Sequence, residues 1–284
     1  MIRFDLGELR LTLLDAGAIW LDGGAMFGVV PRPLWERERV PDEKNRIRLS
    51  MNLLLIEDGK RRTLVDSGAG DKWDDKARAI YRLESRTPRA YMGDVGLAPE
   101  QIDCVISTHL HFDHAGGNTE RDGDGTLHPT FPNAEYVVQG GELETARWHN
   151  ERTRASYIED DFEPLAAETG RLRLVEGDAD WTDHVRLRVA PGHTPAMQMV
   201  QIGSGGRTIC YLADLVPTTS HLRRPYIMGY DLEPLRTLET KKRVLREAFD
   251  EDWILIFEHD PETPMGTLEE REGRLRARPW GPEA

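Results

Sequence analysis

Thiols and excess positive charge are what this chain of 284 residues has least of. Its two cysteines, Cys104 and Cys210, lie far apart in apolar runs, where a buried small side chain is expected. Such spacing excludes the disulfide framework of small secreted domains. Lys and Arg number 37 against 50 Asp and Glu, for a net charge of −13. Because a protein that binds a phosphate backbone needs clustered cations, nucleic acid is not expected as a partner.

Long hydrophobic runs are also missing. The longest uncharged stretch, residues 189–206, is interrupted by prolines, glycines and a histidine. A bilayer-spanning helix needs about 20 predominantly apolar residues. The first ten residues carry charges where a signal peptide would have an apolar core. We therefore expect a cytoplasmic protein that does not contact a membrane.

The composition itself is that of an ordinary globular protein, with 39% hydrophobic and 31% charged residues. A single domain over residues 1–284 is expected, because large α/β or sandwich domains reach such lengths. Strand-like runs recur from residue 9 to residue 257, and helical patterns between them are clearest at 71–83 and 234–249. This mixture predicts sheets covered by helices, without strict β–α alternation. Residues 269–284 are predicted to form a polar C-terminal tail.

Two segments look like weak copies of each other. Residues 52–68 and 197–214 each contain two apolar strands joined by a glycine-containing turn, and each runs through an aspartate after its second strand. They predict an internally duplicated two-sheet core. The alternative is two unrelated hairpins that share turn chemistry.

Residues 16–44 combine apolar side chains with glycines and prolines, which predicts a long apolar loop. Loops of this length in a compact domain are commonly lids, binding segments or partner contacts. We expect this loop to line a substrate pocket or to reach a second copy of the chain in a homodimer, with core packing as the alternative. The candidate pocket residues are Trp20, Met26, Phe27 and Val29.

The densest chemical signal is the segment His-Leu-His-Phe-Asp-His at residues 109–114, which follows an apolar strand-like run. In an extended strand exit, His109 and His111 share a face and can bind one ion together. Asp113 and His114 then project in other directions as the chain turns, and can reach a second ion. Imidazole and carboxylate ligands without thiolate favour zinc, with manganese, cobalt and iron(II) as alternatives.

Three further candidate ligands, His193, Asp214 and His259, each follow an apolar run. Loops at strand ends gather functional side chains on a rigid scaffold. Each of the three is, by itself, as compatible with a structural role as with metal binding. Together with residues 109–114, they would complete a two-metal site.

This succession of motifs resembles the metallo-β-lactamase superfamily over nearly the whole chain. The resemblance implies a four-layer αββα sandwich built from two similar halves, and a hydrolase that uses two divalent metal ions. It also implies the ligand sets: His109, His111 and His193 for one ion, Asp113, His114 and His259 for the other, and Asp214 as the bridge.

Residues 22–35, 42–47 and 221–234 look, more narrowly, like the branch that contains quorum-quenching N-acyl-homoserine lactonases and methyl parathion hydrolase. The implied reaction is attack of a metal-bridging hydroxide on a lactone carbonyl. Hydrolysis of organophosphate triesters or aryl esters is the first alternative, and a thioester hydrolysis like that of glyoxalase II is a weaker one. A metal-binding protein without activity is the non-enzyme alternative.

The catalytic groups beyond the ligands depart from the pattern of some lactonases, which place a tyrosine three residues after the bridging aspartate. This chain has Pro217 there. Tyr226, Tyr230 and His221 follow nearby and are candidates for the missing group, with surface or core packing as the alternative for each. Asp113 is a candidate proton shuttle, in addition to its ligand role.

Overall fold

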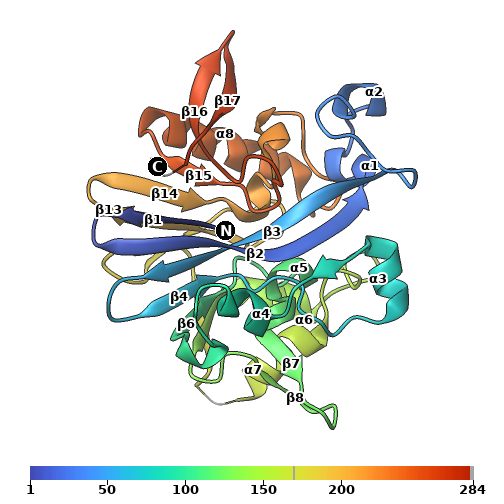
Figure 1. Cartoon of the computed structure of the whole chain (residues 1–284). Coiled ribbons are helices and arrows are strands. Elements are labelled where there is room, and N and C mark those ends of the chain that lie inside the picture. The colour runs from blue at the N-terminus through green and yellow to red at the C-terminus, as the bar shows by residue number, and fades with distance from the viewer. Residues whose placement is uncertain (169, 282–284) are drawn as a thin grey trace.

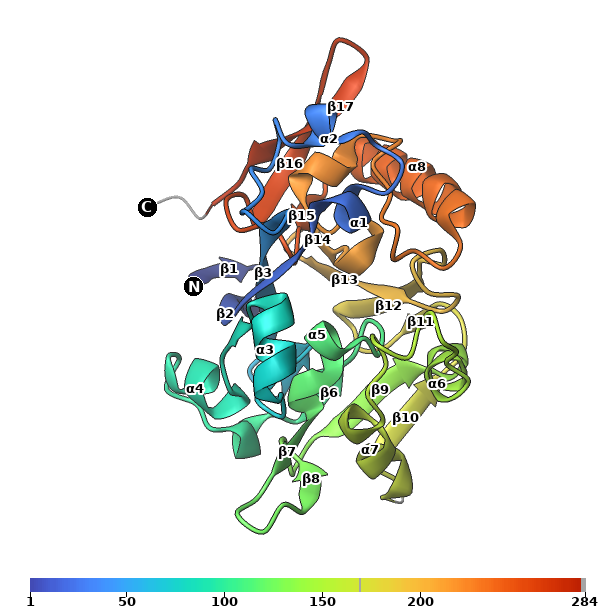
Figure 2. The ribbon, with the colours of Figure 1, turned by 90° about the vertical axis from the view of Figure 1, so that its right-hand side faces the viewer.

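Two large mixed β-sheets pack face to face, and helices cover their outer faces (Figures 1 and 2). The computed structural model describes residues 1–168 and 170–281. In spatial order, the first sheet contains β1 (Ile2–Leu6), β2 (Leu9–Asp22), β3 (Arg46–Glu57), β4 (Arg62–Val65), β6 (Cys104–Ile106), β9 (Glu135–Gln139) and β10 (Leu172–Val175), with β5 (Glu84–Ser85) paired to β2. The second contains β11 (Ala179–Asp180), β12 (Val185–Val189), β13 (Gln198–Ser204), β14 (Arg207–Tyr211), β15 (Ile254–Ile256), β16 (Met265–Arg271) and β17 (Arg274–Pro279).

The remaining elements surround these sheets. A small ribbon of β7 (Thr119–Arg121) and β8 (Leu127–Pro129) lies apart from them. The α-helices are α1 (Gly23–Phe27), α2 (Arg32–Trp35), α3 (Asp75–Tyr81), α4 (Pro88–Gly93), α5 (Phe112–Ala115), α6 (Gly140–Arg147), α7 (Glu163–Ala167) and α8 (Pro234–Asp250). In the described part of the chain, none of them is both long and apolar enough to cross a bilayer.

The layered packing follows from the period-2 alternation of side chains along each strand. In β3, Leu54 and Ile56 join the cluster between the two sheets, whereas Leu53 and Leu55 join the cluster under the helices of the first sheet. A strand buried on both faces reads as a continuous apolar run, which is why residues 52–56 are recognisable in the sequence.

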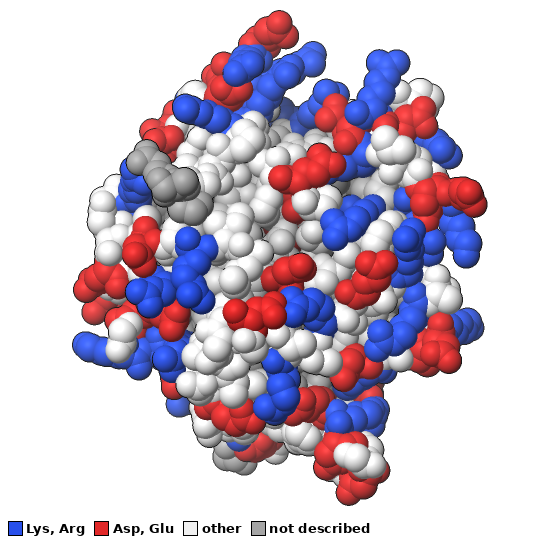
Figure 3. Space-filling model, in the orientation of Figure 1, with Lys and Arg blue, Asp and Glu red and all other residues white. Residues whose placement is uncertain are grey.

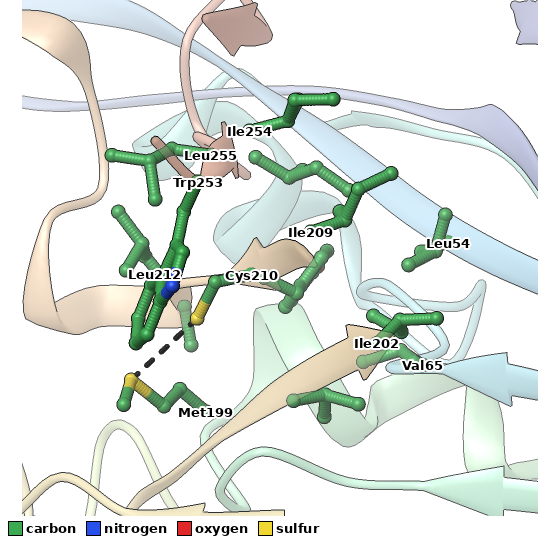
Figure 4. Packing of buried hydrophobic residues seen from close by; sticks show 14 of the residues in the cluster. Leu54, Val65, Met199, Ile202, Ile209, Cys210, Leu212, Trp253, Ile254 and Leu255 are labelled. Atoms are coloured by element: carbon green, nitrogen blue, oxygen red, sulfur yellow. Dashed lines mark hydrogen bonds between the residues drawn. The ribbon is translucent and has the colours of Figure 1, made fainter. Parts of the chain in front are cut away.

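The second sheet shows the same alternation (Figure 4). Ile209 and Ile254 lie toward Leu54 of the first sheet, whereas Cys210 and Leu255 lie on the opposite side. There the Cys210 thiol contacts the Met199 sulfur at 3.7 Å. Helix α8 covers this outer face through buried side chains, including Val244 and Ala248. Both cysteines are free and buried, as expected from their apolar runs.

The duplicated hairpins are present, and each begins a similar arrangement. The strands β3 and β4 form an antiparallel pair, and β4 then pairs in parallel with β6. In the other half, β13 and β14 are antiparallel, and β14 pairs in parallel with β15. The predicted sheets covered by helices are confirmed, and the carboxyl ends of β4, β6, β14 and β15 lead into the candidate site.

Several predicted boundaries are wrong. Residues 16–22 of the expected loop extend β2, and α1 and α2 occupy 23–27 and 32–35, because the apolar side chains there pack against the first sheet. The expected polar tail is instead the hairpin β16–β17, whose backbone hydrogen bonds extend the second sheet to residue 279. Residues 282–284 of that tail lie outside the described residues. The helix expected over 71–83 is shorter, running from Asp75 to Tyr81.

Candidate metal centre

The segment 109–114 leaves β6 in an extended conformation and then enters the short helix α5. The turn after it packs tightly on the loop that follows β4. A Cβ atom on Gly117 would lie 2.2 Å from the Ser67 carbonyl oxygen, so only glycine fits there. Ser67 in turn receives backbone support, because its N–H donates to the His114 carbonyl at 2.7 Å. These contacts fix the four ligand candidates of this segment in one place.

The first ligand group consists of buried atoms from both halves of the molecule. His109 Nε2 lies 3.1 Å from His111 Nδ1, and His193 Nε2 lies 3.0 Å from the same atom. Asp214 Oδ2 is 3.1 Å from His193 Nε2 and 3.9 Å from His109 Nε2. One ligand atom from each of these four side chains lies within 4.8 Å of the others, so the four can bind a single cation together.

The second group lies beside the first. His259 Nε2 is 3.2 Å from His114 Nε2, and Asp113 reaches both at 3.8 to 3.9 Å. Asp214 contacts this group as well, because its Oδ1 lies 3.2 Å from His259 Nε2 and its Oδ2 lies 3.7 Å from His114 Nε2. The two carboxylate oxygens of Asp214 therefore face the nitrogen atoms of both groups.

The donor set fits divalent cations. Several imidazole nitrogens lie about 3 Å from one another, which is the spacing expected of ligands that bind the same ion. The carboxylates of Asp66, Asp113, Asp214 and Glu258 are all buried in this region. Within residues 1–168 and 170–281, Asp214 Oδ1 and both Glu258 oxygens accept no well-aligned hydrogen bond, although Asp214 Oδ1 and Glu258 Oε2 each lie within 3.2 Å of an imidazole nitrogen. Buried carboxylates need compensating positive charge, and bound cations supply it.

The electrostatic field differs between the two groups. Burial and the neighbouring imidazoles hold the pKa of His109 and of His111 well below the ordinary value, so both rings are neutral and available as ligands. Burial also disfavours the charged form of His259, but the Asp214 carboxylate outweighs it and raises the pKa of His259 to about 9. The second group thus lies in the more negative field, which a divalent cation would neutralise.

Residues outside the predicted set hold the ligands in position. Asp66 Oδ2 and Glu258 Oε2 each lie 3.0 Å from His114 Nδ1, and Asp231 Oδ1 lies 2.9 Å from His193 Nδ1. The His259 Nδ1 atom contacts the Ser50 carbonyl oxygen at 2.8 Å. Partners of this kind orient a metal-binding imidazole and select its tautomer. The sequence pattern could have identified Asp66, because it follows the first hairpin as Asp214 follows the second. No pattern in the sequence indicated Asp231.

A cavity of about 130 Å³ opens onto these ligands. Five of the candidate ligands line it: His111, Asp113, His193, Asp214 and His259. Apolar side chains form much of the remaining wall, from Leu21, Met26, Leu49, Phe112 and Met228. Tyr81 and Tyr230 add hydroxyl groups, and Arg152 lies at the same cavity. The lining of the pocket therefore combines polar candidate ligands with apolar side chains.

Comparison with known proteins agrees with this geometry. Residues 47–261 match the family model described as the metallo-beta-lactamase superfamily. The chain belongs to the metallo-β-lactamase superfamily. The fold expected from the sequence motifs, with its two sheets and outer helices, is confirmed by this match and by the solved structures below.

Curated relatives are N-acyl homoserine lactonases. The chain is 28% identical to the one from Bacillus cereus over 174 residues, which are 61% of each chain. It is 30% identical to N-acyl homoserine lactonase AiiA from Bacillus thuringiensis subsp. kurstaki over 171 residues, 59% of this chain and 60% of that one. The match thus spans about three fifths of these relatives.

Solved structures extend the likeness over the whole superfamily fold. A probable metal-dependent hydrolase from Staphylococcus aureus is 27% identical, with a TM-score of 0.88 over 97% of this chain and 99% of that one. AidC, a dizinc quorum-quenching lactonase in complex with a product, superposes with a TM-score of 0.83 over 99% and 98% of the two chains. At 20% identity, the AidC match shows a common fold.

Of the four residues predicted to line the substrate pocket, only Met26 does so. Met26 lines the cavity as expected. Phe27 is fully buried behind it and stacks on His221, and Trp20 lies under the guanidinium of Arg82, 4.4 Å from its ring centre. Val29 is 91% exposed, because Gly28 turns the chain away from the core. Phe27, Trp20 and Val29 do not line the cavity.

Two of the three helper candidates, Tyr226 and His221, also lie away from the cavity lining. His221 uses both ring nitrogens in the core, at 2.8 Å from Thr218 Oγ1 and 2.9 Å from the Met26 carbonyl. Tyr226 is 4% exposed, and its hydroxyl accepts a hydrogen bond from Arg223. Tyr230, four residues further on, does line the cavity. Tyr81 also lines it, and no motif in the sequence marked that residue.

Proposed function

We propose that this chain is a dinuclear metal hydrolase, most simply with zinc, that opens N-acyl-homoserine lactones. The observation that carries the proposal is the position of Asp214, which lines a partly apolar pocket and whose two oxygens face both ligand groups. The lactonase activity of the curated relatives and the imidazole–carboxylate donor set support it. Two bound divalent ions would activate a water molecule and polarise the substrate carbonyl.

The residues of the chain would divide the remaining work. His109, His111 and His193 would hold one ion, and Asp113, His114 and His259 the other, with Asp214 between them. The apolar wall near Met26 and Met228 would exclude water and hold the acyl chain. Asp113 faces the cavity and is the candidate for moving a proton to the leaving oxygen.

The pocket tyrosines supply hydrogen-bond donors. Burial and the nearby Asp113 carboxylate raise the pKa of Tyr81, and burial raises the pKa of Tyr230 above its ordinary value. Both hydroxyls are therefore protonated at neutral pH. We propose Tyr230, in place of Tyr226 and His221, as the group that contacts the substrate oxygen, with Tyr230→Phe kinetics as the test.

The decisive experiment measures metal content and turnover on the same sample. Zinc-loaded protein should bind two ions per chain and hydrolyse a medium-chain N-acyl-homoserine lactone faster than paraoxon or a simple aryl ester. The control is Asp214→Ala, which should lose both metal and turnover. Two bound ions with preferred turnover of paraoxon or the aryl ester would instead favour the phosphotriesterase or esterase alternative.

The exposed apolar residues near α1 and α2 also support a homodimer. Val29 and Val40 are 91% and 87% exposed, and they lie on the same connection between β2 and β3. We propose that a second copy of the chain covers them. Light scattering at micromolar concentration tests this, since a strictly monomeric protein would contradict it.

A further inference from the structure

A second cavity lies outside the metal centre, between α8 and the β16–β17 hairpin. Its volume is about 440 Å³, larger than that of the metal-site cavity. Figures 1 and 2 both place α2, α8 and the hairpin at one end of the molecule, above α5, which contains the end of the histidine motif. None of the candidate metal ligands lines this cavity.

The walls of the second cavity are apolar and basic. Leu34, Leu222, Pro225, Leu245 and Leu275 form its apolar surface. The charged residues that line it are Arg223, Arg224, Lys241, Lys242, Arg246, Arg274 and Glu270. In Figure 3, Lys and Arg side chains gather around the hairpin at the top of the molecule, among a few acidic ones. This excess of cations is unusual for a chain with a net charge of −13.

Two of these cations are available to a ligand. Arg223 is paired with Glu38 at 2.7 Å, Lys242 with Glu239 at 2.7 Å, and Arg246 with Asp250. Among residues 1–168 and 170–281, no carboxylate forms an ion pair with Arg224 or Arg274. A guanidinium binds a carboxylate through two parallel hydrogen bonds. The cavity is thus complementary to an anion that also carries an apolar chain.

The wall of the second cavity continues into the metal site. Residues 222–226 line the second cavity, and Met228 and Tyr230, only a few residues later, line the metal-site cavity. Lys241 lies at the second cavity, and its ammonium group donates to the Tyr226 carbonyl at 2.7 Å and to the His221 carbonyl at 3.1 Å. We call residues 221–231 the strap.

The far end of the strap contacts a candidate metal ligand. Asp231 lies 2.9 Å from His193 Nδ1, and the N–H of Leu232 donates to the His193 carbonyl at 2.9 Å. In its middle, the Gly229 N–H donates to the Ala25 carbonyl, and Arg152 donates to the Gly229 carbonyl. A ligand that orders the first turn of the strap would therefore bias the residues that shape the metal site.

We propose that the cavity between α8 and the β16–β17 hairpin binds a medium-chain acyl carboxylate, and that its occupancy orders the strap that shapes the metal-site pocket. The carboxylate pairs with Arg224 and Arg274, and the chain lies along Leu245 and Leu275. A free fatty acid and an N-acyl-homoserine share this chemistry. The binding itself does not depend on the proposed lactonase activity.

The test uses decanoate and N-decanoyl-homoserine as separate probes in calorimetry on metal-loaded protein. Binding should have a stoichiometry of one at this cavity, and affinity should rise roughly fourfold per added methylene from hexanoate to decanoate. The Arg224→Glu/Arg274→Glu variant should lose at least tenfold in affinity. Arg278→Glu is the control for charge reversal, because it replaces one arginine by glutamate on the same hairpin outside the cavity, and it should bind as the unchanged protein does.

A carboxylate could also bind the metals, so Asp214→Ala separates the two sites. Decanoate binding that survives Asp214→Ala and is lost in the arginine variant supports the proposal. Binding that is lost in Asp214→Ala and kept in the arginine variant overturns it, as does the absence of binding to the unchanged protein. If Asp214→Ala fails to fold, Leu275→Trp, which fills the cavity and leaves the metal ligands intact, should abolish binding; retained affinity overturns the proposal.

Hydrogen exchange measures the coupling to the strap. Decanoate should slow amide exchange over residues 221–231 in the unchanged protein and in Arg278→Glu, and it should have no such effect in the arginine variant. Binding without slower exchange in the strap would overturn the coupling. If N-decanoyl-homoserine binds and decanoate does not, the site recognises the amide-bearing product and the free fatty acid is excluded as its ligand.

Discussion

The two halves of the molecule build their share of the site in different ways from similar strands. In the first half, β3–β4 is followed by the parallel strand β6, and four ligand candidates leave β6 within six residues. In the second half, β13–β14 is followed by the parallel strand β15, and single ligand candidates follow β14 and β15. The third ligand candidate of that half, His193, follows β12.

The aspartates that follow the two hairpins make the comparison concrete. Asp66 follows β4 and contacts the far nitrogen of His114, whereas Asp214 follows β14 and lies among the nitrogens of both ligand groups. Topologically similar positions thus hold a carboxylate that contacts one histidine in the first half and a carboxylate that faces the histidines of both ligand groups in the second. The duplicated strand order therefore determines where each aspartate lies, whereas the side chains around each aspartate determine what it contacts.

Replacing the bridging carboxylate should have the largest effect. Asp214→Asn removes a charge that faces four histidine nitrogens, so both metal positions should weaken together. We expect turnover to fall on the order of 10³-fold, equivalent to about 4 kcal/mol of transition-state stabilisation. Metal analysis of the purified variant checks this, and full occupancy with normal turnover would contradict the bridging role.

The matching substitution in the first half, Asp66→Asn, should reduce metal affinity and turnover less than Asp214→Asn does. Asp66→Asn leaves every candidate ligand in place but weakens the orientation of His114, so metal affinity should fall by about 10–100-fold. Competition with a chelator measures the affinity, and excess metal should restore most of the turnover. An effect as large as that of Asp214→Asn, without rescue by metal, would remove the distinction between the two aspartates.

Replacing His221 tests a contact between the two halves that involves no candidate metal ligand, the stacking of His221 on Phe27. Burial lowers its pKa to about 3, from an ordinary value of 6.5. The unfolded chain therefore takes up a proton as the pH falls below 6.5, while the folded protein does not until about pH 3. Stability should be lost across this window, by at most about 1.4 kcal/mol per pH unit from this group.

The measurement is urea unfolding between pH 7 and pH 4.5, with His221→Gln as the comparison. The variant should be less stable at neutral pH, because it loses the stacking of His221 on Phe27, but its stability should depend less steeply on pH. Parallel curves for the two proteins would show that His221 does not remain neutral in the fold.

The smallest effect is expected at Val29. Within one chain its side chain is 91% exposed and lies outside the metal-site cavity, so Val29→Ser should change the free energy of unfolding of the dissociated chain by less than about 0.5 kcal/mol. Lactone kinetics should be unchanged. A raised KM with an unchanged melting temperature would return Val29 to the substrate pocket, either in its own chain or across a dimer.

The residues that cluster in the candidate metal centre were largely predictable, because histidine and aspartate are recognisable as ligand types in a short segment of sequence. His109, His111, Asp113 and His114 stand together in the sequence, and the other three candidates each follow a recognisable apolar run. The supporting residues were harder to find. Asp231 and Glu258 are ordinary acidic residues by sequence, and only their distances to His193 and His114 give them a role.

The helper and pocket residues were the least predictable. Tyr226, His221 and Phe27 lie on segments near the site, but their side chains face the core, whereas Tyr230 and Tyr81 face the cavity. Tyr226 and Tyr230 lie on an irregular segment, where neither alternation nor helical periodicity predicts the direction of a side chain. Phe27 and Tyr81 end the short helices α1 and α3, which have too few turns for periodicity to identify the face that each residue occupies.

The sequence alone determined the buried strands, the two hairpins and the ligand types, because apolar alternation, turn chemistry and metal preference are properties of short segments. Only the tertiary structure decided which carboxylates support the candidate ligands, which tyrosines line the pocket, and that residues 269–279 belong to a hairpin of the second sheet. Those features depend on contacts between residues far apart in the chain. His193, Asp214 and His259 meet residues 109–114 only because the two sheets pack face to face.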